Sequence, residues 1–187
     1  FKSKGYTESP EGVYLLRGDN IVQGAFRWES VKKWSKEDTQ AYEKYFLEEG
    51  DVVLAMDRTW IKAGLKYAQV LNDDLPCLLV QRVARLRAGD NLNSRFLKHL
   101  LGSKRFTRYV LSIQTGLGVP HISGKQISDF AFYRPTIEIQ KAFDFCKLKQ
   151  KELLQNCPKL KEIRNEVKNL RDLDLLFEKY FLFQLIY

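Results

Sequence analysis

Residues 139–186 read IQKAFDFCKLKQKELLQNCPKLKEIRNEVKNLRDLDLLFEKYFLFQLI, and this segment sets the predicted architecture. Its apolar side chains recur every three, four or seven residues, which on a 3.6-residue helix forms one apolar stripe. The stripe consists of Ile139, Phe143, Cys146, Leu153, Cys157, Leu160, Ile163, Val167, Leu170, Phe177 and Phe181. At about 1.5 Å per residue such a helix spans roughly 75 Å, more than a compact domain needs. We expect a long helix that packs against a partner and acts as a spacer.

Pro158 lies inside this stripe and has no backbone N–H, so we expect the helix to kink or restart there. The apolar spacing stays in phase from Cys157 to Leu160, which favours a kink in a coiled-coil spacer. Six stripe positions are predicted to form a surface for a dimer or partner helix: Leu153, Leu160, Ile163, Val167, Leu170 and Phe177. The alternative is a helix that packs back on its own domain, which is too small to cover so long a stripe well.

The composition predicts one globular domain with a helical extension. Hydrophobic residues make up 44% of the 187 residues, which is enough for a packed core. The formal net charge is +8, and residues 137–187 hold ten Lys and Arg against eight Asp and Glu, so most of the excess lies on the domain. A basic surface favours a polyanionic partner without identifying it. We place the domain at residues 1–135 and the helix at residues 136–187.

The cysteines and the apolar runs favour a cytoplasmic location. Cys77, Cys146 and Cys157 are few and widely spaced, unlike the ligands of a zinc site or a disulfide framework. We predict that they are reduced core residues. No apolar run approaches the roughly 20 residues of a membrane span, so no membrane partner is expected.

The pattern before the helix predicts an α+β domain with a mixed, curved sheet. Apolar runs bounded by turn residues predict strands at residues 12–16, 45–56, 67–70, 78–86 and 129–133. Amphipathic runs predict one helix from Ser94, as its N-cap, to a stop at Gly102, and a second helix at residues 106–113.

Three segments of this domain carry side chains that suit a bound ligand. A basic loop follows a buried strand at residues 57–64, and basic and aromatic residues interleave at residues 23–36. A glycine-rich segment at residues 114–125 allows close backbone approach to a ligand. In the second segment, Trp28 and Trp34 are more often core anchors than stacking platforms.

Together these landmarks resemble the DNA-specificity (S) subunit of type I restriction-modification systems. The similar motifs are GVYLLR at residues 12–17 with NI at 20–21, EGDVVL at 49–54, GVPHIS at 118–123 and PTIEIQ at 135–140. Each motif is moderately specific, but their order and spacing also agree. The FLFQL ending at residues 181–185 is similar to the family's helix end, with Phe183 in place of an expected glycine.

The resemblance implies a target-recognition domain that reads DNA and a conserved helix that docks methyltransferase subunits. Members of the family usually carry two such domains and two helices, whereas this sequence has one of each. It is therefore similar to a half subunit or a fragment, and two copies related by a two-fold axis would rebuild a bipartite reader. The implied partners are double-stranded DNA, methyltransferase (M) subunits, the restriction (R) subunit and a second copy bound through the C-terminal helix.

The resemblance also directs attention to particular side chains in the three segments. The predicted DNA-binding residues are Arg58, Trp60, Lys62 and Lys66 in the first, Arg27 and Lys33 in the second, and His121, Ser123 and Lys125 in the third. Any one of them can equally be a solvated surface residue. Arginine and lysine on phosphates would give salt-dependent affinity, and contacts to base edges would give specificity.

Three other functions remain open. A nuclease would use Asp51 and Asp57, but no further carboxylate follows before Lys62 to complete a metal site. A target-recognition region within a single-chain restriction-methyltransferase would bind DNA in the same way, and a purely structural dimerisation protein would explain the helix but not the charged loops. No methyl-transfer fingerprint or phosphate loop is present, so we expect no catalytic residue, no cofactor and no metal ligand in this sequence.

Overall fold

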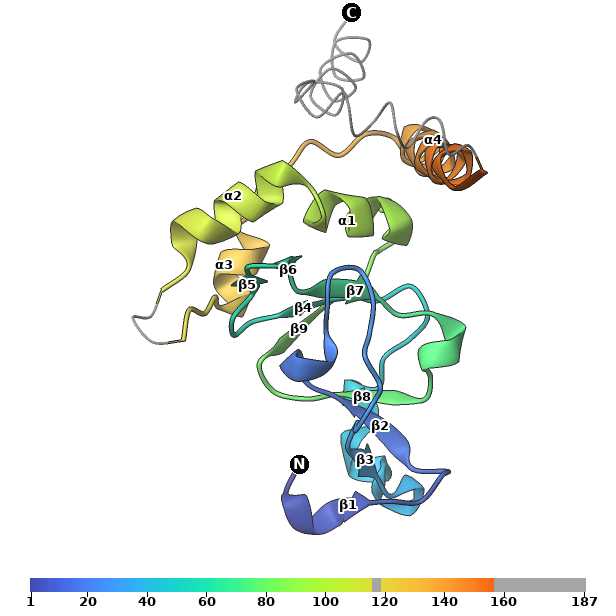
Figure 1. The fold of residues 1–187 in the computed structure, drawn as a ribbon, viewed down its shortest axis with the longest axis vertical. Coiled ribbons are helices and arrows are strands. Elements are labelled where there is room, and N and C mark those ends of the chain that lie inside the picture. Colours follow the sequence, from blue (N-terminus) through green and yellow to red (C-terminus); the bar gives the residue numbers. More distant parts are fainter. Residues whose placement is uncertain (116–118, 157–187) are drawn as a thin grey trace, which may run out of the picture. The chain divides into compact units, whose positions relative to one another are not determined.

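The computed structural model describes residues 1–115 and 119–156 of the chain. By their internal contacts, the residues form two units, Phe1–Lys141 and Ala142–Tyr187. The first unit carries every strand of the described residues, and Figure 1 shows its strands and helices in sequence colours. The predicted boundary between residues 135 and 136 remains a prediction.

Nine short strands form three sheets in the first unit. They are β1 (Tyr6–Thr7), β2 (Val13–Leu16), β3 (Lys33–Trp34), β4 (Val52–Ala55), β5 (Trp60–Ile61), β6 (Gly64–Leu65), β7 (Tyr67–Gln69), β8 (Cys77–Leu79) and β9 (Val83–Leu86). The strand orders are β1-β3-β2-β8, β7-β4-β9 and β5-β6. Because β2 and β8 are parallel and the other paired strands are antiparallel, the first sheet is mixed, as the sequence predicts.

Strand β4 forms the centre of the unit because both of its faces are buried. Val52 and Leu54 pack with the helices, whereas Val53 and Ala55 pack in the core cluster that contains Leu16 from β2. All four β4 residues are fully buried, which explains why the sequence shows a continuous apolar run and not an alternation. The loop that follows β4 thus leaves a strand fixed on two sides.

Helices cover one face of β4. They are α1 (Ser94–Leu101), α2 (Lys104–Ile113) and α3 (Gly124–Ser128), and α4 (Ile137–Asn156) follows them. Short 3-10 turns occupy Ser3–Gly5, Gly18–Asn20, Lys36–Asp38, Gln40–Tyr45 and Asn72–Asp74. Figure 1 shows α1 and α2 along one side of the β7-β4-β9 sheet. Phe106, only 1% exposed, packs in the core between these elements.

The predicted strand at residues 78–86 is wrong, because the segment divides between two sheets. β8 pairs with β2, and β9 pairs with β4. Arg82 between them has a left-handed φ of 65°, which breaks the extended chain. The predicted strand at residues 129–133 is also wrong: this segment has no strand partner, and Phe130 packs edge-on against Phe106 with ring centroids 5.0 Å apart.

Asn93 is the N-cap of helix α1, so the prediction of Ser94 as the N-cap was wrong. The Asn93 side chain accepts hydrogen bonds from the backbone N–H groups of Arg95 and Phe96, both at 3.0 Å. The Ser94 hydroxyl instead accepts from the Gln69 amide at 3.1 Å. Gly102 ends the helix as predicted.

Replacing this cap tests the assignment. We expect Asn93→Ala to lower the free energy of unfolding by about 1 kcal/mol, because two helix N–H groups lose their acceptor. Asn93→Asp supplies an equivalent acceptor and should retain wild-type stability. Urea unfolding followed by circular dichroism measures both variants, and equal stability of the alanine variant and the wild type would contradict Asn93 as the cap.

The start of the predicted long helix is present as α4. Its first turn is tied to the preceding chain by Gln140, which is fully buried. The Gln140 side chain accepts from the Asn93 backbone N–H at 2.8 Å and donates to the carbonyls of Asn91 and Pro135. The positions of Pro158, Leu160, Ile163, Val167, Leu170 and Phe177 lie outside the described residues, as does the side chain of Leu153.

The cysteine predictions are confirmed in part. Cys77 is buried in β8, and this burial raises the pKa of its thiol to about 12. Cys146 is exposed on α4, so its assignment to a core is wrong, and both thiols are free. Among residues 1–115 and 119–156, no helix has the length and apolar character of a membrane span.

Candidate nucleic-acid interface

The three predicted binding segments lie next to one another in the folded unit. Asp57 and His121 form an antiparallel β-bridge, and the Arg58 N–H donates to the Pro120 carbonyl at 2.7 Å. The Gly24 N–H donates to the Tyr67 carbonyl at 2.8 Å. Residues 57–67 therefore contact both residues 23–36 and residues 119–125, which are separate from them in the sequence.

Three of the predicted cations form what we call the basic strip: Arg27, Arg58 and Lys66. Arg27 and Arg58 are exposed, and Lys66 is half-buried. Burial is the main cause that lowers the pKa of Lys66, and the charges of Arg58 and Arg27 lower it further. Asp19 and Asp57 act in the opposite direction. The β-bridge between Gln23 and Tyr67 and the hydrogen bond from the Lys66 N–H to the Thr59 carbonyl hold these stretches of chain side by side, so their cations can act on the same ligand.

The β5-β6 hairpin presents apolar and basic side chains to solvent. Trp60 and Ile61 in β5 are 37% and 38% exposed, and Lys62 follows them in the turn. β6 returns the chain through Gly64, whose φ of 122° is accessible mainly to glycine. Such a two-stranded ribbon has the width that fits the major groove of duplex DNA.

An ion pair fixes the base of this hairpin loop. The Arg82 Nε donates to both carboxylate oxygens of Asp57, at 3.0 and 2.9 Å, and these bonds are the main cause that lowers the pKa of Asp57. The next residue, Arg58, has a left-handed φ of 46°. Asp57 thus sets the point at which the chain turns and presents Arg58 outward. The sequence analysis did not predict that Arg82 pairs with Asp57, because no local motif indicates this contact.

Other predicted residues have structural partners. The Lys33 ammonium donates to the Ser9 carbonyl at 3.2 Å and lies over the Tyr14 ring. Ser123 is the N-cap of α3, where its side chain accepts from the Gln126 N–H at 3.2 Å. Lys125 pairs with Asp129 one helical turn later, at 3.1 Å. Lys33, Ser123 and Lys125 therefore have partners within the protein, and their roles in binding remain predictions.

The tryptophans of the second segment serve the core, as expected. Trp34 is 7% exposed, and Trp28 stacks on Tyr14 with ring centroids 5.0 Å apart. The Trp28 indole N–H donates to the Asp74 carboxylate at 2.8 Å. In this conformation, therefore, neither Trp28 nor Trp34 can stack on a nucleic-acid base.

Asp51, one of the two carboxylates considered for a nuclease, is committed to an ion pair. It is 1% exposed, and its two oxygens accept from Arg87 Nε and Nη2 at 2.7 and 2.8 Å. Asp57 is likewise paired, with Arg82. The described part of the chain contains no cluster of three or more potential metal ligands. Neither carboxylate is free to hold a metal ion in this arrangement.

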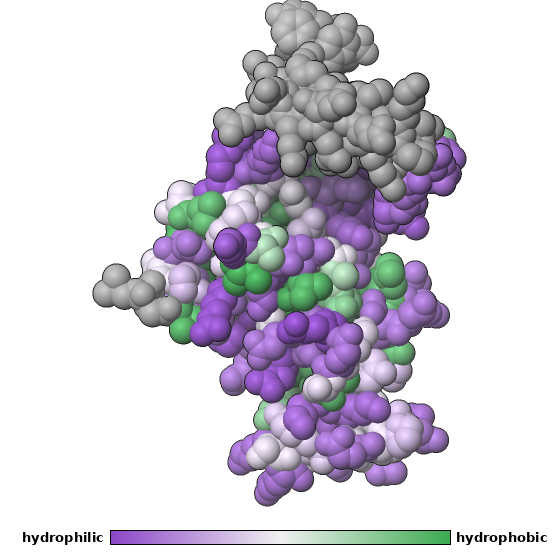
Figure 2. Space-filling model, in the orientation of Figure 1, coloured by the Kyte–Doolittle hydropathy of each residue, from purple (hydrophilic) through white to green (hydrophobic). Residues whose placement is uncertain are grey.

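The face drawn in Figure 2 carries both polar and apolar side chains, and the polar ones predominate. Figure 2 shows a mostly hydrophilic face with small, separate hydrophobic patches. A single broad apolar area, which would indicate a protein-docking surface, is not seen in this view. The exposed cations and the polar surroundings suit a polyanion.

Comparison with known proteins connects this arrangement to a family. No protein-family model matches the chain. The EcoAI specificity subunit of a type I restriction enzyme from Escherichia coli is 40% identical over 166 residues, which cover 87% of this chain and 27% of that protein. This chain is a homologue of type I restriction enzyme specificity subunits.

A second specificity subunit extends the relationship to an archaeal protein. The MjaVIII specificity subunit from Methanocaldococcus jannaschii is 30% identical over 143 residues, which cover 76% of this chain and 33% of that protein. The chain therefore spans about a quarter to a third of the length of these specificity subunits. The predicted resemblance to the family is confirmed.

Two solved structures share the fold. A chain from a structure on complex assembly and conformational transition of the type I R-M system has a TM-score of 0.60 at 15% identity, covering 97% of this chain and 41% of that chain. The HsdS subunit from Thermoanaerobacter tengcongensis has a TM-score of 0.58 at 18% identity, covering 89% of this chain and 41% of that subunit. The mixed α/β part of the predicted fold is confirmed.

The lowered pKa of Lys66 gives this specificity-subunit homologue a testable pH dependence. A phosphate beside Lys66 favours the charged form, so DNA binding should raise its pKa and take up a proton. The affinity should be constant at pH values below the pKa of Lys66 in the free protein. It should fall as the pH rises through that pKa, which lies below the pKa of an ordinary lysine. Fluorescence anisotropy across alkaline pH measures this fall. Lys66→Arg should remove it, and Lys36→Arg, at an exposed site in another turn, should not.

Proposed function

We propose that this chain is a sequence-specific DNA-binding part of a type I restriction-modification system that reads one half of a split target. The observation that carries the proposal is the basic strip of Arg27, Arg58 and Lys66, which two segments bring together and which the third borders through the hydrogen bond between Arg58 and Pro120. Their cations bind phosphates, while the exposed β5-β6 hairpin reaches base edges. The homology to specificity subunits supports the same conclusion.

In this proposal, residues 1–135 form the target-recognition domain and residues 136–187 form a spacer helix. The helix pairs with a second copy and docks methyltransferase subunits, and the restriction subunit joins that assembly. Its length sets the separation of the two half-sites. We assign no catalytic role to the chain, since catalysis belongs to the partner subunits of such a system, and we place it in the cytoplasm.

Selection of DNA by the purified chain tests this function. Light scattering gives the mass of the chain alone and with a cognate methyltransferase subunit, and duplexes bound from a random pool are then sequenced. We expect a dimer that enriches two inverted half-sites separated by a fixed gap, because two identical readers select identical sequences. A monomer that enriches no sequence, and binds no methyltransferase subunit, would contradict the proposal.

A further inference from the structure

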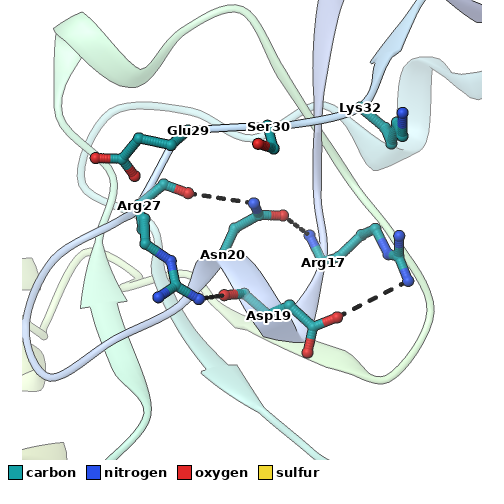
Figure 3. Close-up of a pocket in the computed structure, with 7 residues that line it drawn as sticks. All are labelled: Arg17, Asp19, Asn20, Arg27, Glu29, Ser30 and Lys32. Carbon is teal, nitrogen blue, oxygen red and sulfur yellow. Dashed lines mark hydrogen bonds and ion pairs between the residues drawn. The ribbon is translucent and has the colours of Figure 1, made fainter.

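A pocket of about 200 Å³ lies beside the basic strip and adds two cations, Arg17 and Lys32, that were not among the predicted DNA-binding residues. Its lining includes Arg17, Arg27, Lys32, Asp19 and Glu29, and Figure 3 shows Arg17 and Lys32 on one side of Asn20 and Arg27 and Glu29 on the other. This volume is below that of sites for whole drug-sized ligands and suits a single anionic group. Arg27 belongs to both the pocket and the basic strip, so the two are continuous.

Asn20 holds the two arginines of the pocket in place. It is 8% exposed, and its side-chain oxygen accepts from the Arg17 backbone N–H at 3.1 Å. Its amide nitrogen donates to the Arg27 carbonyl at 3.2 Å, and the Arg27 N–H donates to the Asn20 carbonyl at 2.9 Å. One buried amide thus joins the backbone of both arginines, which fixes where their side chains begin.

Both guanidinium groups approach the same residue. Arg27 Nη2 donates to the main-chain carbonyl of Asp19 at 3.2 Å, and Arg17 Nη2 lies 3.9 Å from the Asp19 carboxylate. The Arg27 contact leaves its other N–H groups available to a ligand. The Asp19 carboxylate is 85% exposed, so its pairing with Arg17 is weak and exchangeable.

Lys32 completes the pocket on the side of Arg17. The chain turns between Arg27 and Lys32 at Ser30, which has a left-handed φ of 60°. The Lys32 carbonyl accepts from the Leu15 N–H at 2.9 Å, which ties this wall to β2. Lys32 has one ion pair, at 3.9 Å to Glu8, whose side chain is 94% exposed. Its ammonium can therefore turn to a stronger anion at small cost.

We propose that this pocket is a clamp for one phosphodiester group of bound DNA, held by Arg17 and Lys32, with Asn20 as the positioning residue and Arg27 on the far side, where it joins the basic strip. The inference rests on the proposed function, because the DNA that crosses the basic strip supplies the phosphate. Three cations outnumber the two carboxylates of the lining, and the planar guanidinium groups match phosphate oxygens. The clamp fixes the register of the duplex and reads no base.

The test compares two charge-matched double variants of the full chain. Arg17→Gln with Lys32→Gln removes the two clamp cations outside the basic strip, and Lys2→Gln with Lys36→Gln removes two exposed lysines near other strands. Fluorescence anisotropy measures the affinity for the selected duplex and for a scrambled one over a range of salt. We expect the clamp variant to bind both duplexes about 10- to 30-fold more weakly, with a salt slope lower by about 2. The control variant should change the slope much less.

A variant that is expected to bind more tightly provides a second test, because misfolding would not increase the affinity. Asp19→Asn removes the carboxylate that competes with phosphate for Arg17 and keeps the carbonyl that holds Arg27, so it should bind both duplexes several-fold more tightly. Unchanged affinity and slope in the clamp variant would overturn the clamp while leaving the proposed function intact. A loss confined to the selected duplex would overturn it too, since it would indicate base readout. Absence of duplex binding by the wild type would overturn both proposals.

Discussion

Replacing Arg27, Arg58 and Lys66 together by glutamine should weaken DNA binding on the order of 1,000-fold at physiological salt. Each charged hydrogen bond to a phosphate or a base contributes about 1.5 kcal/mol, and a factor of ten corresponds to about 1.4 kcal/mol. The three residues come from two segments that the fold brings together, so they act on one stretch of duplex. Titration of the wild type and the variant with the selected duplex measures the loss.

The pattern of this loss separates the roles of the three cations. Single variants that lose affinity equally for all sequences have lost a phosphate contact, whereas a variant that relaxes the preference at one base pair has lost a base contact. A triple variant at Lys2, Lys4 and Lys36 removes the same charge from exposed lysines outside the basic strip, and it should retain most of the affinity. Equal weakening of both triple variants would mean that net charge alone drives binding.

Removing Arg87 should have the largest effect on stability among the single substitutions considered. Asp51 is 1% exposed and relies on Arg87 for two hydrogen bonds, at 2.7 and 2.8 Å. Arg87→Ala leaves the carboxylate buried without its cation. We expect the free energy of unfolding to fall by about 2 kcal/mol, below the range for fully buried pairs because the Arg87 side chain is 41% exposed.

A double-mutant cycle shows that the buried carboxylate causes this loss. Asp51→Asn combined with Arg87→Ala removes the unpaired charge and should recover part of the stability relative to Arg87→Ala alone. Glu48→Gln removes the exposed partner of Arg87 and should cost less than about 0.5 kcal/mol. Urea unfolding measures the wild type, the Asp51→Asn and Arg87→Ala single variants, their double variant and Glu48→Gln. Additive effects of the Asp51 and Arg87 substitutions would contradict the coupling between them.

Local patterns were sufficient to predict β2 and β7, because each is a short run between turn residues. The strand predicted at residues 45–56 was too long: only Val52–Ala55 forms β4, and the Gly50 turn precedes it. Local patterns failed at residues 78–86, where the chain leaves one sheet and enters another. The turn there depends on Arg82 in a left-handed conformation, and arginine is not among the residues that predict a turn. Asn93 and Ser94 are both good cap residues, so only the observed hydrogen bonds distinguish them.

The interface was predictable as separate segments but not as a site. The family resemblance directed attention to Arg27, Arg58 and Lys66 one by one, yet their proximity depends on long-range contacts such as the Gly24 to Tyr67 hydrogen bond. Ion pairs also form between residues that are distant in the sequence: Arg87 and Asp51 are 36 positions apart. A cation held in such a pair is less available to bind a ligand, and the sequence does not show which cations are paired.

The placement of β4 has an evolutionary consequence. Because packing fixes this strand on both faces, the hairpin that follows it can change length or sequence while the scaffold stays intact. New target preferences can then arise by exchange of a few hairpin residues between Trp60 and Leu65, without a matching change in the core. In the proposed role, a host that must often alter its DNA target would gain from a reader whose variable part is separated in this way from its packed core.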